Sequence, residues 1–230
     1  MPSRSRGAGI QLFQSFLDAG TRALQGMPRH NDNQGYEAYT LILSGGKTSR
    51  GEVDKKELDL LQEEMKKAND LIGIKKVFCA DFADNAFDSV PLLEIVKEIE
   101  KIKQEIKPEI IFTHHLGDMN IDHQITHRAV LTATRPMQDE CVKTIYAIEV
   151  PSSTEWNSFS AQNAFIANVF FEVEDTIDLK IKAMAEYKSE LRDYPHPRSL
   201  QHLKELAKVN GTKVGLNYSE NFILVRGVNV

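Results

Sequence analysis

The sequence predicts an α/β fold, a Rossmann-like and mostly parallel sheet with helices on both faces. Short apolar segments of strand length alternate with amphipathic segments of helix length along most of the chain, which is the pattern of strand–helix–strand crossovers. The 230 residues suffice for one such domain with a sizeable core. The composition, 41% hydrophobic and 27% charged, is that of an ordinary globular domain.

The expected elements follow one another from residue 39 onward. Residues 39–43 are a continuous apolar run that ends at Ser-Gly-Gly, which is typical of a buried parallel strand. Residues 55–72 repeat apolar side chains with the helical period and end at Gly73. Pro91 suits the first turn of a second helix. The remaining strands are expected at residues 76–80, 109–113, 143–150, 167–173 and 221–226, and the remaining helices at residues 91–106, 122–134 and 176–187.

Residues 1–35 do not fit this pattern. They contain no lysine and are rich in arginine, serine, glycine and glutamine. Only residues 10–24 have the pattern of a helix, and no buried strand is expected before Tyr36. We therefore expect an atypical N-terminal segment at 1–35 that is poorly ordered or helical, and a single α/β domain at 36–230. The first strand of the sheet is expected to be absent or altered.

Charge and hydropathy exclude two classes of partner. The net charge is −5 and the basic residues are mixed with acidic ones, so no nucleic-acid surface is expected. No apolar run approaches the roughly 18 residues of a membrane span, and the N-terminus lacks the apolar region of a secretory signal. Cys79 and Cys141 lie far apart in strand-like surroundings and are expected to be buried thiols. The expected location is the cytoplasm.

The densest chemical signal lies at residues 113–127. This stretch holds four of the seven histidines, together with Asp118 and Asp122. It follows an apolar run and precedes a helical pattern, so it is expected at the sheet edge where α/β proteins bind ligands. Neutral imidazole and carboxylate bind zinc, whose bound water is a nucleophile near neutral pH. A single histidine in a loop is usually a solvated or hydrogen-bonded residue, but the cluster taken together indicates a hydrolytic metal site with His123 as a ligand.

This stretch resembles the second metal motif of the PIG-L/LmbE-like N-deacetylases, in the branch that carries Asn-x-Asp-His. The resemblance covers residues 36–228, because further segments agree with the family in order. These segments are residues 39–46, 62–68, 84–88, 150–156, 194–199 and 218–222. Members of the family have a Rossmann-like fold and use zinc to remove acetyl from N-acetylated amino sugars and related amides.

The resemblance implies roles for four residues. His123 would be a metal ligand and Asp122 its acidic neighbour. Asn120 stands where many members have a second histidine that steadies the tetrahedral intermediate. His196, between two prolines, would contact the substrate or the transition state, although a rigid surface turn is the ordinary alternative. We take Asp122, Asn120 and His196 as the catalytic candidates and His123 as the metal ligand.

Four further residues are candidates for binding substrate. Arg198 could hold a substrate anion, because its planar fork suits bidentate contacts, or could be an ordinary surface arginine. Asp84, Asn85 and Asp88 lie on the predicted rim and could hydrogen-bond sugar hydroxyls. Three loops are expected along that rim, at residues 44–51, 81–88 and 114–123.

The other histidines of the stretch are expected to support the site rather than to bind metal. His114 and His115 belong to this group, and His127 is expected on the helix surface or behind a ligand. His123 and His127 have the spacing of a zinc-protease pair, but Gln124 stands where those proteases carry glutamate. A protease is therefore disfavoured.

The sequence departs from the family at its first motif, His-Pro-Asp-Asp-Glu. That motif supplies two zinc ligands and the general base, and it is absent. His30 lies in a stretch, Arg-His-Asn-Asp-Asn-Gln, that resembles the motif only faintly and fails its register and spacing. Three explanations stay open: an N-terminus altered by a shifted reading frame or a wrong start, a non-catalytic member of the family, or a site with unfamiliar ligands.

We expect a hydrolase of linear amide bonds, a PIG-L/LmbE-like metal-dependent N-deacetylase. Its partner would be a small N-acetylated amino sugar or glycoconjugate, and its cofactor would be zinc, with binding weakened or lost through the missing motif. The chain could also form a homo-oligomer. The alternative function is a catalytically inactive family member that acts as a sugar-binding or interaction module.

Overall fold

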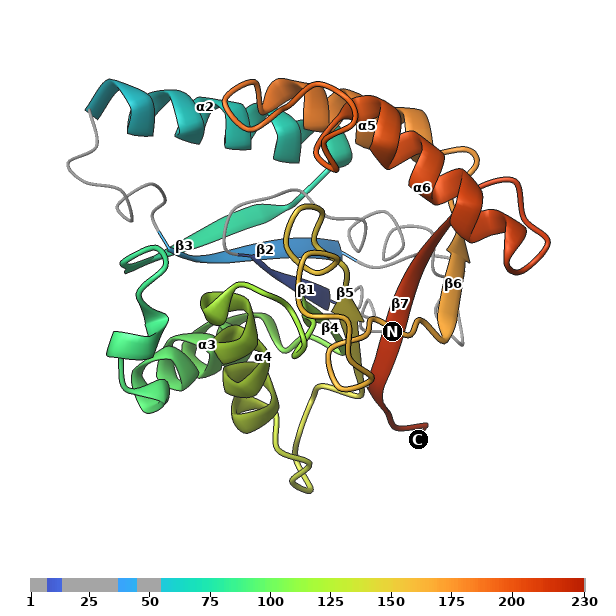
Figure 1. Cartoon of the computed structure of the whole chain (residues 1–230). Coiled ribbons are helices and arrows are strands. Elements are labelled where there is room, and N and C mark those ends of the chain that lie inside the picture. Colours follow the sequence, from blue (N-terminus) through green and yellow to red (C-terminus); the bar gives the residue numbers. More distant parts are fainter. Residues whose placement is uncertain (1–7, 14–36, 45–54, 230) are drawn as a thin grey trace, which may run out of the picture.

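A single mixed sheet runs through the centre of the molecule (Figure 1). The computed structural model describes residues 8–13, 37–44 and 55–229. The seven strands lie in the order β3-β2-β1-β4-β5-β7-β6. They are β1 (Ala8–Phe13), β2 (Glu37–Ser44), β3 (Lys76–Phe82), β4 (Ile110–His114), β5 (Thr144–Ile148), β6 (Val169–Glu172) and β7 (Ser219–Gly227). Strands β1 to β5 pair in parallel, whereas β7 runs antiparallel to both β5 and β6.

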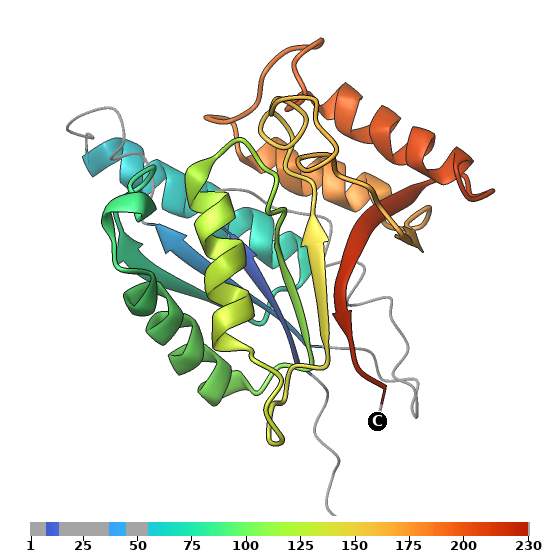
Figure 2. The same cartoon turned by 60° about the horizontal axis from the view of Figure 1, so that its bottom comes forward.

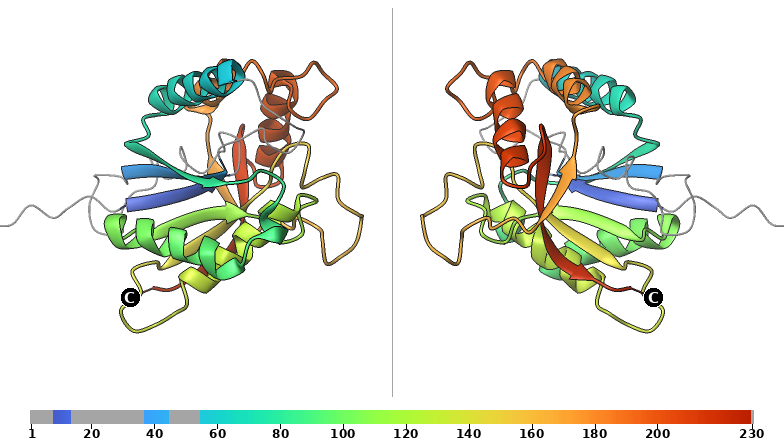
Figure 3. Two further views of the ribbon diagram at one scale, coloured as in Figure 1. Left: turned by 90° about the vertical axis from the view of Figure 1, so that its left-hand side faces the viewer. Right: turned by 90° about the vertical axis from the view of Figure 1, so that its right-hand side faces the viewer.

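Helices cover both faces of this sheet, so the predicted α/β class is confirmed. They are α2 (Lys55–Ile72), α3 (Leu92–Ile106), α4 (Ile121–Ala133), α5 (Ile177–Glu186), α6 (Leu200–Thr212) and the short 3₁₀ helix η2 (Phe87–Ser89). Helices α3 and α4 pack together on one face, and α2, α5 and α6 lie on the other, as the side views show (Figure 3). None of the helices in the described part of the chain combines the length and hydropathy that a bilayer span requires.

The structure contains a strand that the sequence did not predict. Strand β1 pairs in parallel with β2 along all six of its residues and with β4 through Gly9, Ile10 and Gln11. The expectation that no strand precedes Tyr36 is therefore wrong. The physical reason is that strands β2 and β4 have backbone groups that need hydrogen-bond partners. A short segment without proline can supply these partners and form a strand between them, even without an apolar pattern. The helix expected at residues 10–24 otherwise falls outside the described residues.

Helix α6 was also missed, although its start is marked locally. The side chain of Ser199 accepts a hydrogen bond from the backbone N of His202 at 3.1 Å, which caps the helix. Leu203 and Ala207, one turn apart on α6, are buried and form its inner face. The other expected helices and strands are all present, with ends that differ by a few residues.

The core lies on both faces of β4. Phe112 is fully buried, and its ring packs against Tyr146 at 5.1 Å and against Phe222 at 5.2 Å between ring centroids. The opposite face of the sheet packs Ile111 against the cluster under α3 and α4. The predicted burial of the cysteines is wrong, because Cys79 is exposed on edge strand β3 and Cys141 is only half-buried.

The parallel strands deliver their following loops to one edge of the sheet. Strand β4 ends at His114 and strand β5 at Ile148, and they pair in parallel. Figure 2 shows the loops after both strands at the same end of the molecule, beside the start of α4. This edge is where open α/β sheets bind ligands.

Candidate active site

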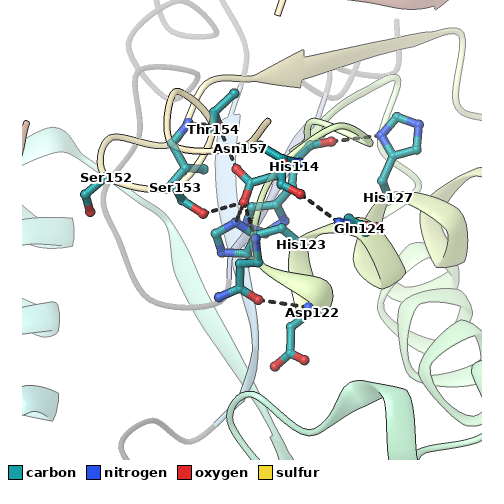
Figure 4. A network of polar contacts seen from close by, with 12 residues as sticks. His114, Asp122, His123, Gln124, His127, Ser152, Ser153, Thr154 and Asn157 are labelled. Atoms are coloured by element: carbon teal, nitrogen blue, oxygen red, sulfur yellow. Dashed lines mark hydrogen bonds and ion pairs between the residues drawn. The ribbon is translucent and has the colours of Figure 1, made fainter. Parts of the chain in front are cut away.

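Asp118 is the centre of a buried polar network in the loop between β4 and α4. Its Oδ1 accepts hydrogen bonds from the backbone N of Asn120 at 2.8 Å and from the hydroxyl of Ser153. Its Oδ2 accepts from the hydroxyl of Thr154 at 2.6 Å. Nδ1 of His123 lies 3.0 Å from Oδ1, although the ring is not aligned for an ideal hydrogen bond. Figure 4 shows this network from close by.

The network keeps Asp118 ionised. Burial by itself raises the pKa of this carboxyl, but the His123 ring and the hydroxyls of Ser153 and Thr154 outweigh burial and lower the pKa to about 2. A carboxylate with no exposed surface is stable only when it is paired and hydrogen-bonded. The site therefore contains a fixed negative charge beside His123.

His123 stacks on a second imidazole, that of His114. The two ring centroids are 4.1 Å apart and the planes differ by 11°. Burial, and then the adjacent His123 ring, lower the pKa of His114 well below its usual value, so His114 is neutral. Among the described residues, Nδ1 of His114 has no hydrogen-bond partner. Because an imidazole binds a metal in its own plane, two parallel stacked rings do not direct their nitrogens at one ion.

The described residues supply one oriented imidazole rather than a zinc site. In the part of the chain that the structure describes, no three histidine, cysteine or acidic side chains converge on one point, whereas a catalytic zinc takes three protein ligands. The contact of His123 with Asp118 does match one part of such a site, since a ligating histidine usually gives its other ring N–H to a carboxylate. His30 lies outside the described residues. The described residues therefore do not supply enough ligands to hold a zinc ion by themselves.

His127 faces away from the pair. Its Nδ1 lies 2.8 Å from the backbone carbonyl oxygen of His114, and Figure 4 shows its ring well separated from that of His123. This contact ties α4 to the end of β4. His127 is buried, so the expectation of a place on the helix surface is wrong, and the alternative that it lies behind a ligand stays a prediction.

Asp122 and Asn120 shape the start of α4. The side chain of Asn120 caps the helix, because its Oδ1 accepts from the backbone N of Asp122 at 2.9 Å. Asp122 is fully buried and accepts from the backbone N of Phe87 at 3.0 Å. Figure 4 shows its carboxylate directed away from His114 and His123. Geometry thus gives both residues structural contacts, and their catalytic roles stay predictions.

The contact between Phe87 and Asp122 brings the loop after β3 to the start of α4. Asp84 and Asn85 lie on this loop, and Asp88 lies in the 3₁₀ helix η2 that follows it. Asn85 and Asp88 are exposed, and Asn85 has a left-handed backbone with φ of 54°. The loop after β3 therefore borders the segment 114–123, while residues 45–51 of the third loop expected on this rim lie outside the described residues.

His196 and Arg198 reach the site from the segment before α6. Nδ1 of His196 accepts from the backbone N of Arg198 at 3.0 Å, so the neutral ring carries its proton on Nε2. The ring lies edge-on to Trp156, with centroids 5.4 Å apart. Arg198 donates through Nε to the hydroxyl of Ser152 at 2.5 Å and through Nη1 to Glu190 at 2.8 Å. These contacts make Arg198 a link between loops.

The turn after β5 is the part of the site that the sequence assigned no role. Ser152, Ser153 and Thr154 are all buried, and their hydroxyls reach Arg198 and Asp118. The available signal was a run of hydroxyl residues directly after a strand, inside a segment that resembles the family. Its partners lie 35 or more residues away, so spacing could not identify them.

Replacing Thr154 by valine is expected to destabilise the fold by about 1–3 kcal/mol. The hydroxyl accepts from the backbone N of Val150 at 2.8 Å and donates to Asp118, and both buried groups would lose a partner. Urea denaturation measures the change. Thr132→Val is the matched control, because the Thr132 hydroxyl bonds only the exposed helix carbonyl of Arg128; an equal loss in both variants would contradict the prediction.

Gly117 is the point where the loop after β5 docks on the Asp118 loop. Asn157 donates to the carbonyl oxygen of Gly117 at 2.8 Å, and Nε2 of His115 lies 3.1 Å from the carbonyl oxygen of Asn163. A Cβ on Gly117 would lie 2.6 Å from the Asn163 Cα. This approach is too close for any side chain other than hydrogen.

Gly117→Ala is therefore expected to displace residues 157–165 and to cost about 1–3 kcal/mol. Limited proteolysis of this loop and urea denaturation measure the two effects. Gly227→Ala is the control, since its Cβ would meet only flexible Leu224 side-chain atoms at 3.5 Å or more. Undiminished protection of residues 157–165 in Gly117→Ala would contradict the expectation.

The fold and this site define a Rossmann-like α/β protein with a histidine–carboxylate centre at the carboxyl edge of its sheet. The model of the PIG-L family, described as GlcNAc-PI de-N-acetylase, matches residues 21–134. This match supports a PIG-L/LmbE-like N-deacetylase, as the resemblance of its motifs implied.

Individual relatives agree with this assignment. The chain is 22% identical to the diacetylchitobiose deacetylase of Thermococcus kodakarensis over 202 residues, which covers 85% of this chain and 75% of that protein. Three solved structures are similar in fold. GalB, the 4-carboxy-2-hydroxymuconate hydratase of Pseudomonas putida KT2440, has a TM-score of 0.72 at 18% identity, with 97% of this chain and 98% of that chain covered.

The other two structures are deacetylases by name. The N,N'-diacetylchitobiose deacetylase of Pyrococcus horikoshii has a TM-score of 0.67 at 16% identity, with 98% of this chain and 86% of that chain covered. The zinc-inhibited form of the teicoplanin deacetylase Orf2 has a TM-score of 0.69 at 16% identity, with 98% and 100% covered. At these identities the likeness is one of fold.

Proposed function

We propose that this chain is an N-deacetylase-type amidohydrolase that releases acetate from an N-acetylated amino sugar or glycoconjugate. The observation that carries the proposal is the contact of Asp118 with His123 at the carboxyl edge of the sheet, in a chain that the model of the PIG-L family matches. The substrate class is supported by a relative that acts, by name, on diacetylchitobiose.

The residues of the site have chemistry that suits this reaction. With Nδ1 turned to Asp118, His123 keeps Nε2 for a proton of the attacking water or for a metal ion. The amide NH₂ of Asn120 and the Nε2–H of His196 are donors for a developing oxyanion. Asp84, Asn85 and Asp88 are the proposed contacts to sugar hydroxyls.

Zinc would supply an activated water molecule if it were bound. The described residues contribute one ligand to it, His123, and we therefore assign no step to the metal. Asp122 is proposed to act by fixing the start of α4, given its contact with Phe87. Arg198 is proposed to hold the His196 segment in place rather than to bind a substrate anion, because Ser152 and Glu190 already accept its hydrogen bonds.

A catalytically inactive, sugar-binding member of the family is the second candidate. It is favoured by the single imidazole ligand among the described residues. The two candidates share the fold and differ in turnover. The unpaired cysteines suit a reducing compartment, so the cytoplasm is the proposed location of either. Self-association into a homo-oligomer stays a prediction.

The test measures metal content and acetate release on the same purified sample. The protein is prepared with and without added zinc, and N-acetylglucosamine and diacetylchitobiose are offered as substrates. Acetate release that falls after chelation and returns with zinc supports the deacetylase and its metal. Sugar binding without acetate release, at any zinc concentration, supports the inactive member instead.

A further inference from the structure

We propose that Asp118, held by the turn of residues 150–155, is the positioning residue of the site. It fixes the His123 ring in the tautomer that carries its proton on Nδ1, so that Nε2 is the nitrogen left for chemistry. The catalytic consequence of this inference rests on the proposed function, whereas the tautomer is a property of the folded chain itself.

The carboxylate of Asp118 is surrounded by hydrogen-bond donors. Asp118 receives donors from two separate parts of the chain: the start of α4 through the backbone N of Asn120, and the turn after β5 through the hydroxyls of Ser153 and Thr154. Nδ1 of His123 lies 3.0 Å from its Oδ1. A carboxylate used only to cap a helix needs one such donor. The remaining contacts bind the Asp118 loop to a second segment, so the carboxylate cannot swing away from His123.

The direction of the hydrogen bond between Thr154 and Asp118 is fixed. The Thr154 hydroxyl accepts from the backbone N of Val150 at 2.8 Å, so its single proton is free to go to Asp118 Oδ2, 2.6 Å away. The turn therefore acts on Asp118 as a donor. A carboxylate whose other partners all donate is left as an acceptor for the Nδ1–H of His123.

The backbone of the same turn is strained at Ser152. Ser152 has φ of 66°, in the left-handed region that residues other than glycine rarely adopt. Glu155 stabilises this conformation by accepting from the backbone N of Ser152 at 2.6 Å. In this conformation the Ser152 hydroxyl reaches Arg198 while those of Ser153 and Thr154 reach Asp118. One turn thus holds both the His123 ring and the His196 segment.

Stacking completes the restraint on His123. Its ring lies nearly parallel to that of buried His114 at 4.1 Å, which opposes rotation of the imidazole out of its plane. The alternative is a purely structural role, in which Asp118 only anchors its loop. A structural role requires the hydrogen bonds from Asn120, Ser153 and Thr154. It does not predict which nitrogen of His123 carries the proton.

The test reads the tautomer directly by ¹⁵N NMR of the imidazoles at a pH where His123 is neutral, with His123→Gln used to assign the signal. We expect a single Nδ1–H tautomer in the wild-type protein. Asp118→Asn, which keeps the size of the side chain and removes the charge, is expected to give a mixture of both tautomers. It should also lower kcat by about 10–100-fold while leaving KM nearly unchanged.

Glu140→Gln is the matched control. Glu140 is a half-buried carboxylate with several partners, including Lys103 at 2.6 Å and the backbone N of Val142 at 2.9 Å, but it precedes β5 at the opposite end of the strands. We expect this variant to lose stability and to keep the wild-type tautomer and kcat.

An Nε2–H tautomer in the wild-type protein would overturn the inference without any variant. A folded Asp118→Asn variant in which His123 keeps a pure Nδ1–H tautomer would also overturn the inference. A wild-type protein with the Nδ1–H tautomer and no acetate release would support positioning by Asp118 while refuting the deacetylase proposal, so the two failures are distinguishable.

Discussion

Replacing His123 by alanine is expected to lower kcat/KM for acetate release by about 10²–10⁴-fold, the range that loss of a positioned proton-transfer group produces. Asp118 orients the His123 ring, because Nδ1 of that ring faces the carboxylate at 3.0 Å. Nε2 of His123 is then the nitrogen left for proton transfer. The loss should appear mainly in kcat, measured by enzymatic determination of acetate at saturating and limiting substrate.

His127→Asn is the matched control for this change. His127 lies one turn further along α4 and is equally buried, but its Nδ1 faces the carbonyl oxygen of His114, a contact that the asparagine amide can reproduce. We expect this variant to keep activity within a few-fold of the wild type. Comparable losses in the two variants would refute a specific role for His123.

Phe112→Ala is expected to destabilise the fold by about 3–5 kcal/mol, as large-to-small changes of buried aromatic residues do. Phe112 is fully buried on β4, and its ring contacts those of Tyr146 and Phe222, so the cavity would open where three strands meet. Since a domain has only about 5–15 kcal/mol of stability in total, a large share would be lost. Urea denaturation followed by far-UV circular dichroism gives the midpoint and the slope.

Phe159→Ala removes the same side chain from a fully exposed position. Its free energy of unfolding is expected to stay within about 0.5 kcal/mol of the wild type. A Phe112→Ala variant whose unfolding midpoint matched that of Phe159→Ala would mean that the aromatic cluster around β4 is not part of the cooperative core.

Most of the fold could be predicted because its strands and helices carry local patterns. Helix α2 was placed with its observed ends, since apolar side chains recur with the helical period and Gly73 follows. Strand β1 could not be placed, because Ala8–Phe13 contains glycine and glutamine and takes its position from the pairing of β2 and β4 on either side. Pairing with neighbouring strands, and not a local sequence pattern, determines that this segment is a strand.

The site likewise has one part that local sequence could predict and one part that it could not. His123, Asp118 and their loop were visible because they lie within six residues of one another. The hydroxyls of Ser153 and Thr154, which hold Asp118, are 35 and 36 residues away, and no pattern within a single sequence connects them. The structure therefore adds the partners that arrive from β5 and from the segment before α6.

The place of β7 has a consequence for how the protein is made. Strand β7 lies between β5 and β6 and carries Phe222 into the core, so the sheet cannot close before residues 219–227 have left the ribosome. Until then the nascent chain presents an unpaired edge of β5 and an uncovered aromatic surface around Phe112, both of which favour aggregation. Ribosome-associated chaperones should accordingly bind this chain late in its synthesis, and a stop codon before residue 219 should yield insoluble product.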